Sequence, residues 1–118
     1  MATSICKNTT IQVINVINKI TFTDTNAINF NYTYFYKYGR IVYFQIAFNT
    51  SLTDQKKIAT VDTSISPIGN QYWFIIANSA GGSSYARLNI KSDGWYIITP
   101  NVSVGSGAFV SGYYICNE

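Results

Sequence analysis

The chain has 118 residues, of which 47% are hydrophobic and 16% aromatic, while only 11% are charged and the formal net charge is +3. No apolar run approaches the ~20 residues that span a membrane, and without a basic stripe the chain lacks the electrostatic footprint of nucleic-acid binding. Asn, Thr and Ser replace charge at the surface. Such a surface suits neutral, hydroxyl-rich ligands or extensive protein contacts, although AT-rich coding produces the same bias.

A chain of this length forms one domain with a real core. The polar first ten residues are predicted to be a flexible segment, which leaves residues 11–118 as the domain. Because no secretory signal is recognisable, we expect synthesis in a cytosol. The two cysteines, Cys6 and Cys116, lie near the two ends. A bridge between them is sterically possible in a β-sandwich, but a cytosolic origin favours free thiols, so the sequence leaves their pairing open.

Short strands are predicted at 11–16 and 20–23, and a longer alternating pattern follows. Aromatic residues stand at every second position from 30 to 38, and a second alternating run covers 42–48. Period two is typical of a β-strand, whose successive side chains point to opposite faces. The two runs around Gly39 therefore predict a β-hairpin. The aromatic row is either part of the core or a binding platform.

The register of this hairpin favours the core. A two-residue turn at Tyr38-Gly39 would mix apolar and polar residues on both faces. A three-residue loop at 37–39 separates the faces and places Gly39 where a left-handed residue is wanted. This loop pairs Tyr34 with Val42, Tyr32 with Phe44, Phe30 with Ile46 and Ile28 with Phe48. The sequence thus predicts that Phe30, Tyr32 and Tyr34 are buried, with Tyr36 and Tyr38 at the turn end.

The rest of the chain reads as further strands. A strand is predicted at 57–61 and a loop at 62–70. The segment 71–78 is apolar on both faces, so it needs a second cover, often another subunit. An Asp93-Gly94 type I′ turn predicts a hairpin over 86–99 that pairs Ser92 with Trp95 and buries Leu88 and Ile90.

In the last strand, 108–116, Gly112 indicates a bulge or a close backbone approach. No segment has sustained helical periodicity. We therefore expect an all-β fold, an antiparallel β-sandwich or jelly roll.

The inventory for catalysis is thin. The chain contains no histidine, which excludes any triad that uses one, and two cysteines without histidine cannot form a normal zinc site. Asp54 and Asp62 could converge as a glycosidase pair, but acidic residues near turns usually bond to the turn backbone. The sequence thus predicts a protein that is not an enzyme and needs no metal or cofactor.

Carbohydrate binding is compatible with this composition. Sugars dock their C–H faces on aromatic rings while polar groups bond their hydroxyl edges. The candidate ligand-binding residues are Trp95, Trp73, Tyr85, Arg87, Asp62 and Asn78. Trp73 lies in an apolar run, so it could equally be part of the core. Trp95 follows a turn and is expected to be partly exposed. Arg87 could equally form an interface ion pair.

The order of elements resembles the C-terminal head domains of tail-fibre and baseplate receptor-binding proteins from phages of Gram-positive bacteria. The resemblance covers about residues 29–116 and is one of pattern. It is carried by the segments YGRIVYFQIAF at 38–48, KIATV at 57–61, ISPI at 65–68, ARLNI at 86–90, DGWYII at 93–98 and VSGYYI at 110–115. The loop at Pro67 lacks the aromatic and basic residues often found beside that proline in the family.

The resemblance implies a homotrimeric head at the virion tail tip, made in the bacterial cytoplasm, that binds a host cell-surface glycan or protein. It implies neither nucleic-acid binding nor membrane insertion. Two alternatives remain open at this point: a structural module that trimerises or caps a fibre without a ligand, and a lectin-like adhesin domain on a bacterial surface.

Overall fold

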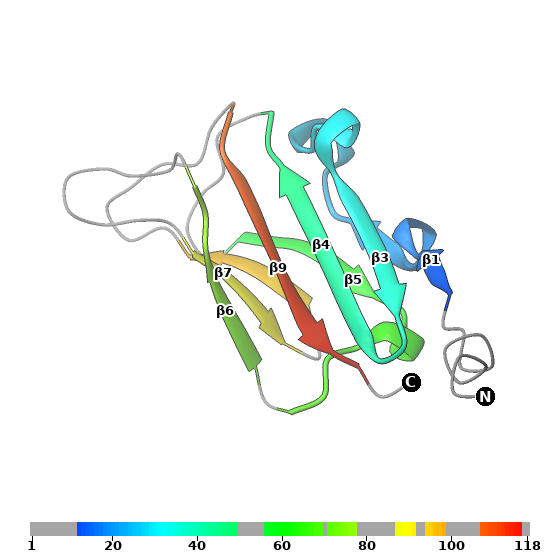
Figure 1. Ribbon diagram of the computed structural model, residues 1–118. Helices are drawn as coiled ribbons and strands as arrows, with labels where there is room; N and C mark the ends of the chain where they lie inside the picture. Colours follow the sequence, from blue (N-terminus) through cyan, green and yellow to red (C-terminus); the bar gives the residue numbers. More distant parts are fainter. Residues whose placement is uncertain are drawn as a thin grey trace, which may run out of the picture.

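The computed structural model describes residues 12–49, 56–69, 71–77, 87–91, 94–98 and 107–116, which form two antiparallel sheets (Figure 1). In spatial order the four-stranded sheet contains β1 (Val13–Asn15), β3 (Tyr34–Tyr38), β4 (Ile41–Ala47) and β9 (Phe109–Ile115). The five-stranded sheet contains β2 (Ile20–Phe22), β5 (Lys56–Val61), β8 (Gly94–Ile98), β7 (Arg87–Lys91) and β6 (Gln71–Ile75).

This arrangement confirms the expected all-β, antiparallel fold and is consistent with a β-sandwich. Each strand lies where the sequence pattern predicts one. In the described residues, helical structure is confined to single 3-10 turns: η1 (Ile17–Lys19), η2 (Thr25–Ala27), η3 (Phe30–Tyr32) and η4 (Thr63–Ile65). The predicted flexible segment 1–10 lies outside the described part of the chain.

The register predicted for the aromatic hairpin is wrong. The predicted pair Ile28 and Phe48 does form a bridge, but η3 then removes three residues from the ladder. Beyond it Phe35 pairs with Phe44, and Tyr38 pairs with Ile41. Because three is an odd number, the shift turns every later side chain of the strand to the other face.

A two-residue connection therefore joins β3 and β4. It begins with Gly39 at a φ of 60°, so the expectation of a left-handed glycine here is confirmed. Phe30, Tyr32 and Tyr34 are exposed rather than buried. The aromatic row is thus not the core face of the hairpin.

The core instead contains Phe35, Phe44, Trp95 and Tyr114, each at most 1% exposed. Their ring centroids lie 5.1 to 6.5 Å apart, mostly in tilted or edge-to-face contacts. Such pairs add about 0.5–1.5 kcal/mol each beyond the burial of their area. The indole N–H of Trp95 has no hydrogen-bond partner among the described residues, so ring packing holds this side chain.

The β7–β8 hairpin shows a smaller error. Its register pairs Ile90 with Trp95 and Lys91 with Gly94, a shift of two residues from the prediction. Gly94 is therefore a strand residue, while Asp93 lies outside the described residues. An even shift keeps the faces unchanged, and Leu88 and Ile90 are buried as predicted.

β9 lies close to β6. Its register with β4 is continuous from end to end, which excludes a bulge at Gly112. A Cβ atom on Gly112 would overlap the ring of Phe74, so the alternative prediction of a close approach is confirmed. Cys116, just after β9, is a buried free thiol, and Cys6 lies outside the described residues.

Candidate functional site

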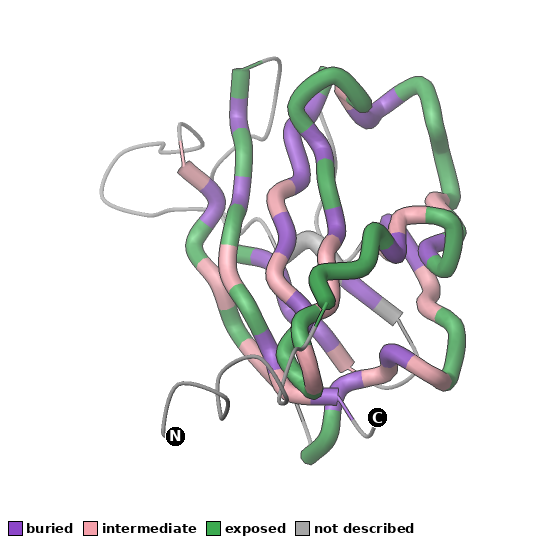
Figure 2. Tube along the Cα trace, turned by 45° about the vertical axis from the view of Figure 1, so that its right-hand side comes forward, coloured by how far each residue is buried: buried purple, intermediate pink, exposed green. Residues whose placement is uncertain are grey.

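The outward face of the four-stranded sheet carries a group of exposed aromatic residues. Figure 2 shows how buried and exposed residues alternate along its strands. The register places the following side chains on this face: Val13, Asn15, Tyr34, Tyr36, Tyr38, Ile41, Tyr43, Gln45, Ala47, Phe109, Ser111, Tyr113 and Ile115. None of them is charged. We call the set Tyr34, Tyr36, Tyr38, Tyr43 and Tyr113 the tyrosine face.

Three rings of the tyrosine face, those of Tyr34, Tyr36 and Tyr43, contact one another. The ring of Tyr36 lies 5.7 Å from that of Tyr34 along β3 and 5.7 Å from that of Tyr43 on β4. Tyr43 in turn is the register partner of Tyr113 on β9. Tyr113 is 63% exposed and Tyr38 45% exposed, so these rings offer their surfaces to solvent. Such rings can contact a ligand without first rearranging the sheet.

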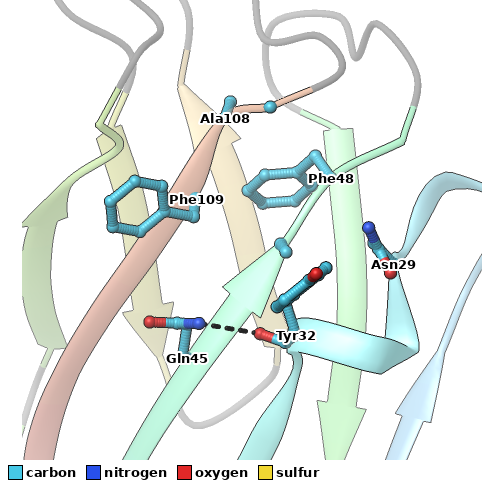
Figure 3. A pocket seen from close by; sticks show the side chains of 8 residues that line it. Asn29, Tyr32, Gln45, Phe48, Ala108 and Phe109 are labelled. Carbon is cyan, nitrogen blue, oxygen red and sulfur yellow. Dashed lines mark hydrogen bonds between the residues drawn. The ribbon is translucent and has the colours of Figure 1, made fainter.

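A pocket of about 370 Å³ opens at the end of this face that lies away from Gly39 (Figure 3). It is lined by Asn29, Tyr32, Gln45, Ala47, Phe48, Gly107, Ala108 and Phe109. Phe109 from β9 and Tyr32 from η3 lie on opposite sides of β4. This volume is at the lower end of the range of about 300–1,000 Å³ that is usual for small-molecule sites.

Short hydrogen bonds fix the wall that η3 contributes. The Thr33 hydroxyl donates to the carbonyl of Asn29 at 2.8 Å and accepts from the backbone N–H of Ala47 at 3.0 Å. The Gln45 Nε2 donates to the carbonyl of Tyr32 at 2.9 Å, which orients the amide (Figure 3). Asn29 Oδ1 accepts from the backbone N–H of Asn31 at 3.2 Å. The 3-10 turn η3, which shifts the register of the hairpin from the predicted one, therefore also forms one wall of the pocket.

The pocket combines exposed rings with side-chain amides. Tyr32 is 64% exposed and Phe109 37% exposed. The Gln45 amide lies between these two rings, and Asn29 lies beside Tyr32 (Figure 3). Rings of this kind accept the C–H face of a sugar, and amides bond to hydroxyl groups. Among the residues that the structure describes, the lining includes no carboxylate, imidazole or thiol. These described residues offer groups that can bind a ligand.

The structure separates the candidate residues that the sequence had grouped. The expectation that Trp95 is partly exposed is wrong. Its side chain points into the core cluster and is fully buried. Trp73 on β6 is 48% exposed, and the Arg87 guanidinium lies 5.6 Å from the centroid of its ring, in a cation–π contact. Tyr85 and Asn78 lie outside the described residues.

Asp62 lies far from that pair. Its backbone N–H donates to the carbonyl of Lys19 next to β2, while Trp73 is on β6 at the opposite edge of the same sheet. The carboxylate accepts from the backbone N–H of Ser64 at 2.9 Å, and this bond, together with the Ser64 hydroxyl, lowers the pKa of Asp62. The prediction that acidic residues near turns bond to the turn backbone is confirmed here and at Asp24.

The sequence pattern alone does not point to the pocket residues Tyr32, Gln45, Asn29 and Phe109. One available signal was Asn29, directly before the aromatic run, because an asparagine that bonds to the backbone two residues on interrupts a strand. The partners from β4 and β9 could be found only once the register was known.

In the described part of the chain, no helix is long and apolar enough to cross a membrane. Within those same residues, no group of three His, Cys, Asp or Glu side chains could hold a metal ion. The sequence matches no protein-family model. It matches no curated protein either.

Proposed function

We propose that this protein is a non-enzymatic receptor-binding head of a phage tail fibre or baseplate, which attaches the virion to a saccharide on the host cell surface. The observation that carries the proposal is the pocket in which Tyr32 and Phe109 flank the Gln45 amide on an uncharged face. The resemblance of the chain to such heads supports the same function.

The proposal includes a homotrimer at the tail tip with jelly-roll connectivity. In support, β6 exposes Trp73 and Ile75, at 48% and 65%, on the side away from the core. A neighbouring subunit would supply the second cover that this strand's sequence calls for. Weak single sites then suffice, because several copies on one tip raise the avidity.

The exposed apolar side of β6 also favours a second candidate function, a structural module that joins or caps a fibre without binding a ligand. Such a module would trimerise through β6 but show no saccharide binding. Oligomeric state alone does not separate the two functions, whereas ligand binding does.

A glycan array followed by titration of the strongest ligand tests the proposal. We expect Tyr32→Ala to weaken binding about tenfold, which corresponds to about 1.4 kcal/mol. Trp73→Ala removes an exposed ring from the other sheet and should leave the affinity of a single site, measured in the titration, unchanged. Absence of binding to any glycan at millimolar concentration would refute the receptor function. Loss of binding in Trp73→Ala alone would move the site to β6.

A further inference from the structure

The pocket and the tyrosine face form one continuous surface. Gln45 lines the pocket and is also the register partner of Tyr34 on one side and Ser111 on the other. The next row toward Gly39 contains Tyr36, Tyr43 and Tyr113. The row after it contains Tyr38 together with three apolar residues, Val13, Ile41 and Ile115. From Ala47 to Ile41 on β4 this surface is about 20 Å long, at ~3.4 Å per residue. It is several times longer than one sugar ring.

The chemistry of this surface fits an uncharged ligand. It offers phenol rings and hydroxyls together with the uncharged polar groups of Asn15, Gln45 and Ser111. A site for an anionic chain would be expected to present Arg or Lys, which pair with carboxylate or phosphate. No residue that the register places on this face has a charge. Each phenol hydroxyl can both donate and accept, as sugar hydroxyls require.

We propose that the tyrosine face is an extended subsite that binds an uncharged, linear polysaccharide of several sugar units, laid from the pocket toward Gly39. This inference rests on the proposed function, whose saccharide pocket it extends. A second copy of the chain is the other possible occupant of such a face. Continuity with the pocket through Gln45 and the mixture of amides and hydroxyls favour the polysaccharide.

Affinity electrophoresis of the full chain tests the inference. Native gels would contain dextran, mannan, galactan, xylan or starch as neutral probes, and alginate or dextran sulfate as anionic probes. We expect a neutral polymer to retard the protein and its hexasaccharide to compete about tenfold better than its monosaccharide. Tyr113→Ala should remove most of this length advantage and leave competition by the monosaccharide unchanged. Tyr32→Ala should weaken competition by both.

The outcomes separate the two proposals. If a neutral polymer retards the protein but monosaccharide and hexasaccharide compete equally, the pocket binds saccharide and the extended subsite is wrong. Retardation by the anionic polymers alone would also overturn the inference. If light scattering shows an oligomer that Tyr113→Asp dissociates while Trp73→Ala does not, a second copy covers the face, which contradicts the inference. Absence of retardation in every gel would refute the proposed function and the inference with it.

Discussion

The two faces of the four-stranded sheet are built from the same strands, yet their aromatic residues serve different ends. Phe35 and Phe44 point inward and are at most 1% exposed. Their chain neighbours Tyr34, Tyr36 and Tyr43 point outward onto a face on which the described residues carry no charge. The inner rings pack against Trp95 and Tyr114, while the outer rings contact one another in tilted arrangements. Aromatic content alone therefore does not show where a core lies, whereas register does.

Replacement of the two tryptophans tests where the core lies, and we expect the largest loss of stability here. Trp95→Ala should lower the free energy of unfolding by about 3–5 kcal/mol, because it empties the centre of the core. Trp73→Ala removes a half-exposed ring and the contact with Arg87, and should cost about 1 kcal/mol or less. Urea denaturation followed by circular dichroism measures both. Equal losses would contradict the placement of the core.

Gly112→Ala tests how closely the two sheets approach at β9. The added methyl group would overlap the ring of Phe74, so we expect a loss of about 1–3 kcal/mol in the free energy of unfolding. Ser111→Ala, on the exposed side of the same strand, should change stability little. Combining Gly112→Ala with Phe74→Leu should recover part of the loss. If the loss persists in full, the ring of Phe74 is not its cause.

Thr33→Val tests the turn that brings the outer aromatic residues to the pocket. Valine has the same shape but cannot bond to Asn29 or to the buried N–H of Ala47, so we expect a loss of about 1–2 kcal/mol. Hydrogen exchange at the Ala47 amide should become faster, and saccharide affinity should fall. Thr21→Val, at the exposed position of β2, is the matched control. Unchanged exchange at Ala47 would show that the Thr33 bond is unimportant.

Substitution of Tyr114 should change the free energy of unfolding least, and this change depends on pH. Burial, with a smaller contribution from nearby Cys116, raises the pKa of Tyr114 above its usual value of 10.0. The folded state thus holds this proton more tightly than the unfolded state, so the stabilisation is complete below pH 10 and is lost as the pH rises above it. Tyr114→Phe should cost about 1 kcal/mol at neutral pH through the lost bond to Ile65 and should flatten the alkaline decline. An unchanged alkaline slope would contradict this assignment.

The sequence predicts most of the fold because alternation locates strands without knowledge of their partners. The all-β class, the placement of the strands and the buried face of Leu88 and Ile90 all follow from it. Register is a different matter, since it depends on how many residues each connection removes from the ladder. In the β7–β8 hairpin the predicted register is wrong by two residues, an even number, so the buried face is still correct. In the aromatic hairpin η3 shifts the register by three residues, so the side chains of β3 point to the opposite face from the one predicted.

The candidate site was less predictable for the same reason. Trp95 was expected at the surface because it follows a turn, but its face of β8 packs against Phe35 and Phe44. The pocket joins Tyr32, Gln45 and Phe109, which are far apart in the chain and meet only through the pairing of β4 with β9 and of Gln45 with η3. Long-range pairing of this kind is not contained in local pattern.

One sheet carries a core on one face and, as we propose, a saccharide-binding surface on the other. The adjacent β4 residues Tyr43 and Phe44 give the most direct test of this division. In the alanine variant of each, we would measure the free energy of unfolding and the affinity for a neutral polysaccharide that retards the wild-type protein in native gels. We expect Phe44→Ala to lose about 3–5 kcal/mol of stability. Tyr43→Ala should keep nearly all of its stability and lose most of its affinity. A Tyr43→Ala protein that is as destabilised as Phe44→Ala, or that binds the polysaccharide undiminished, would contradict the account.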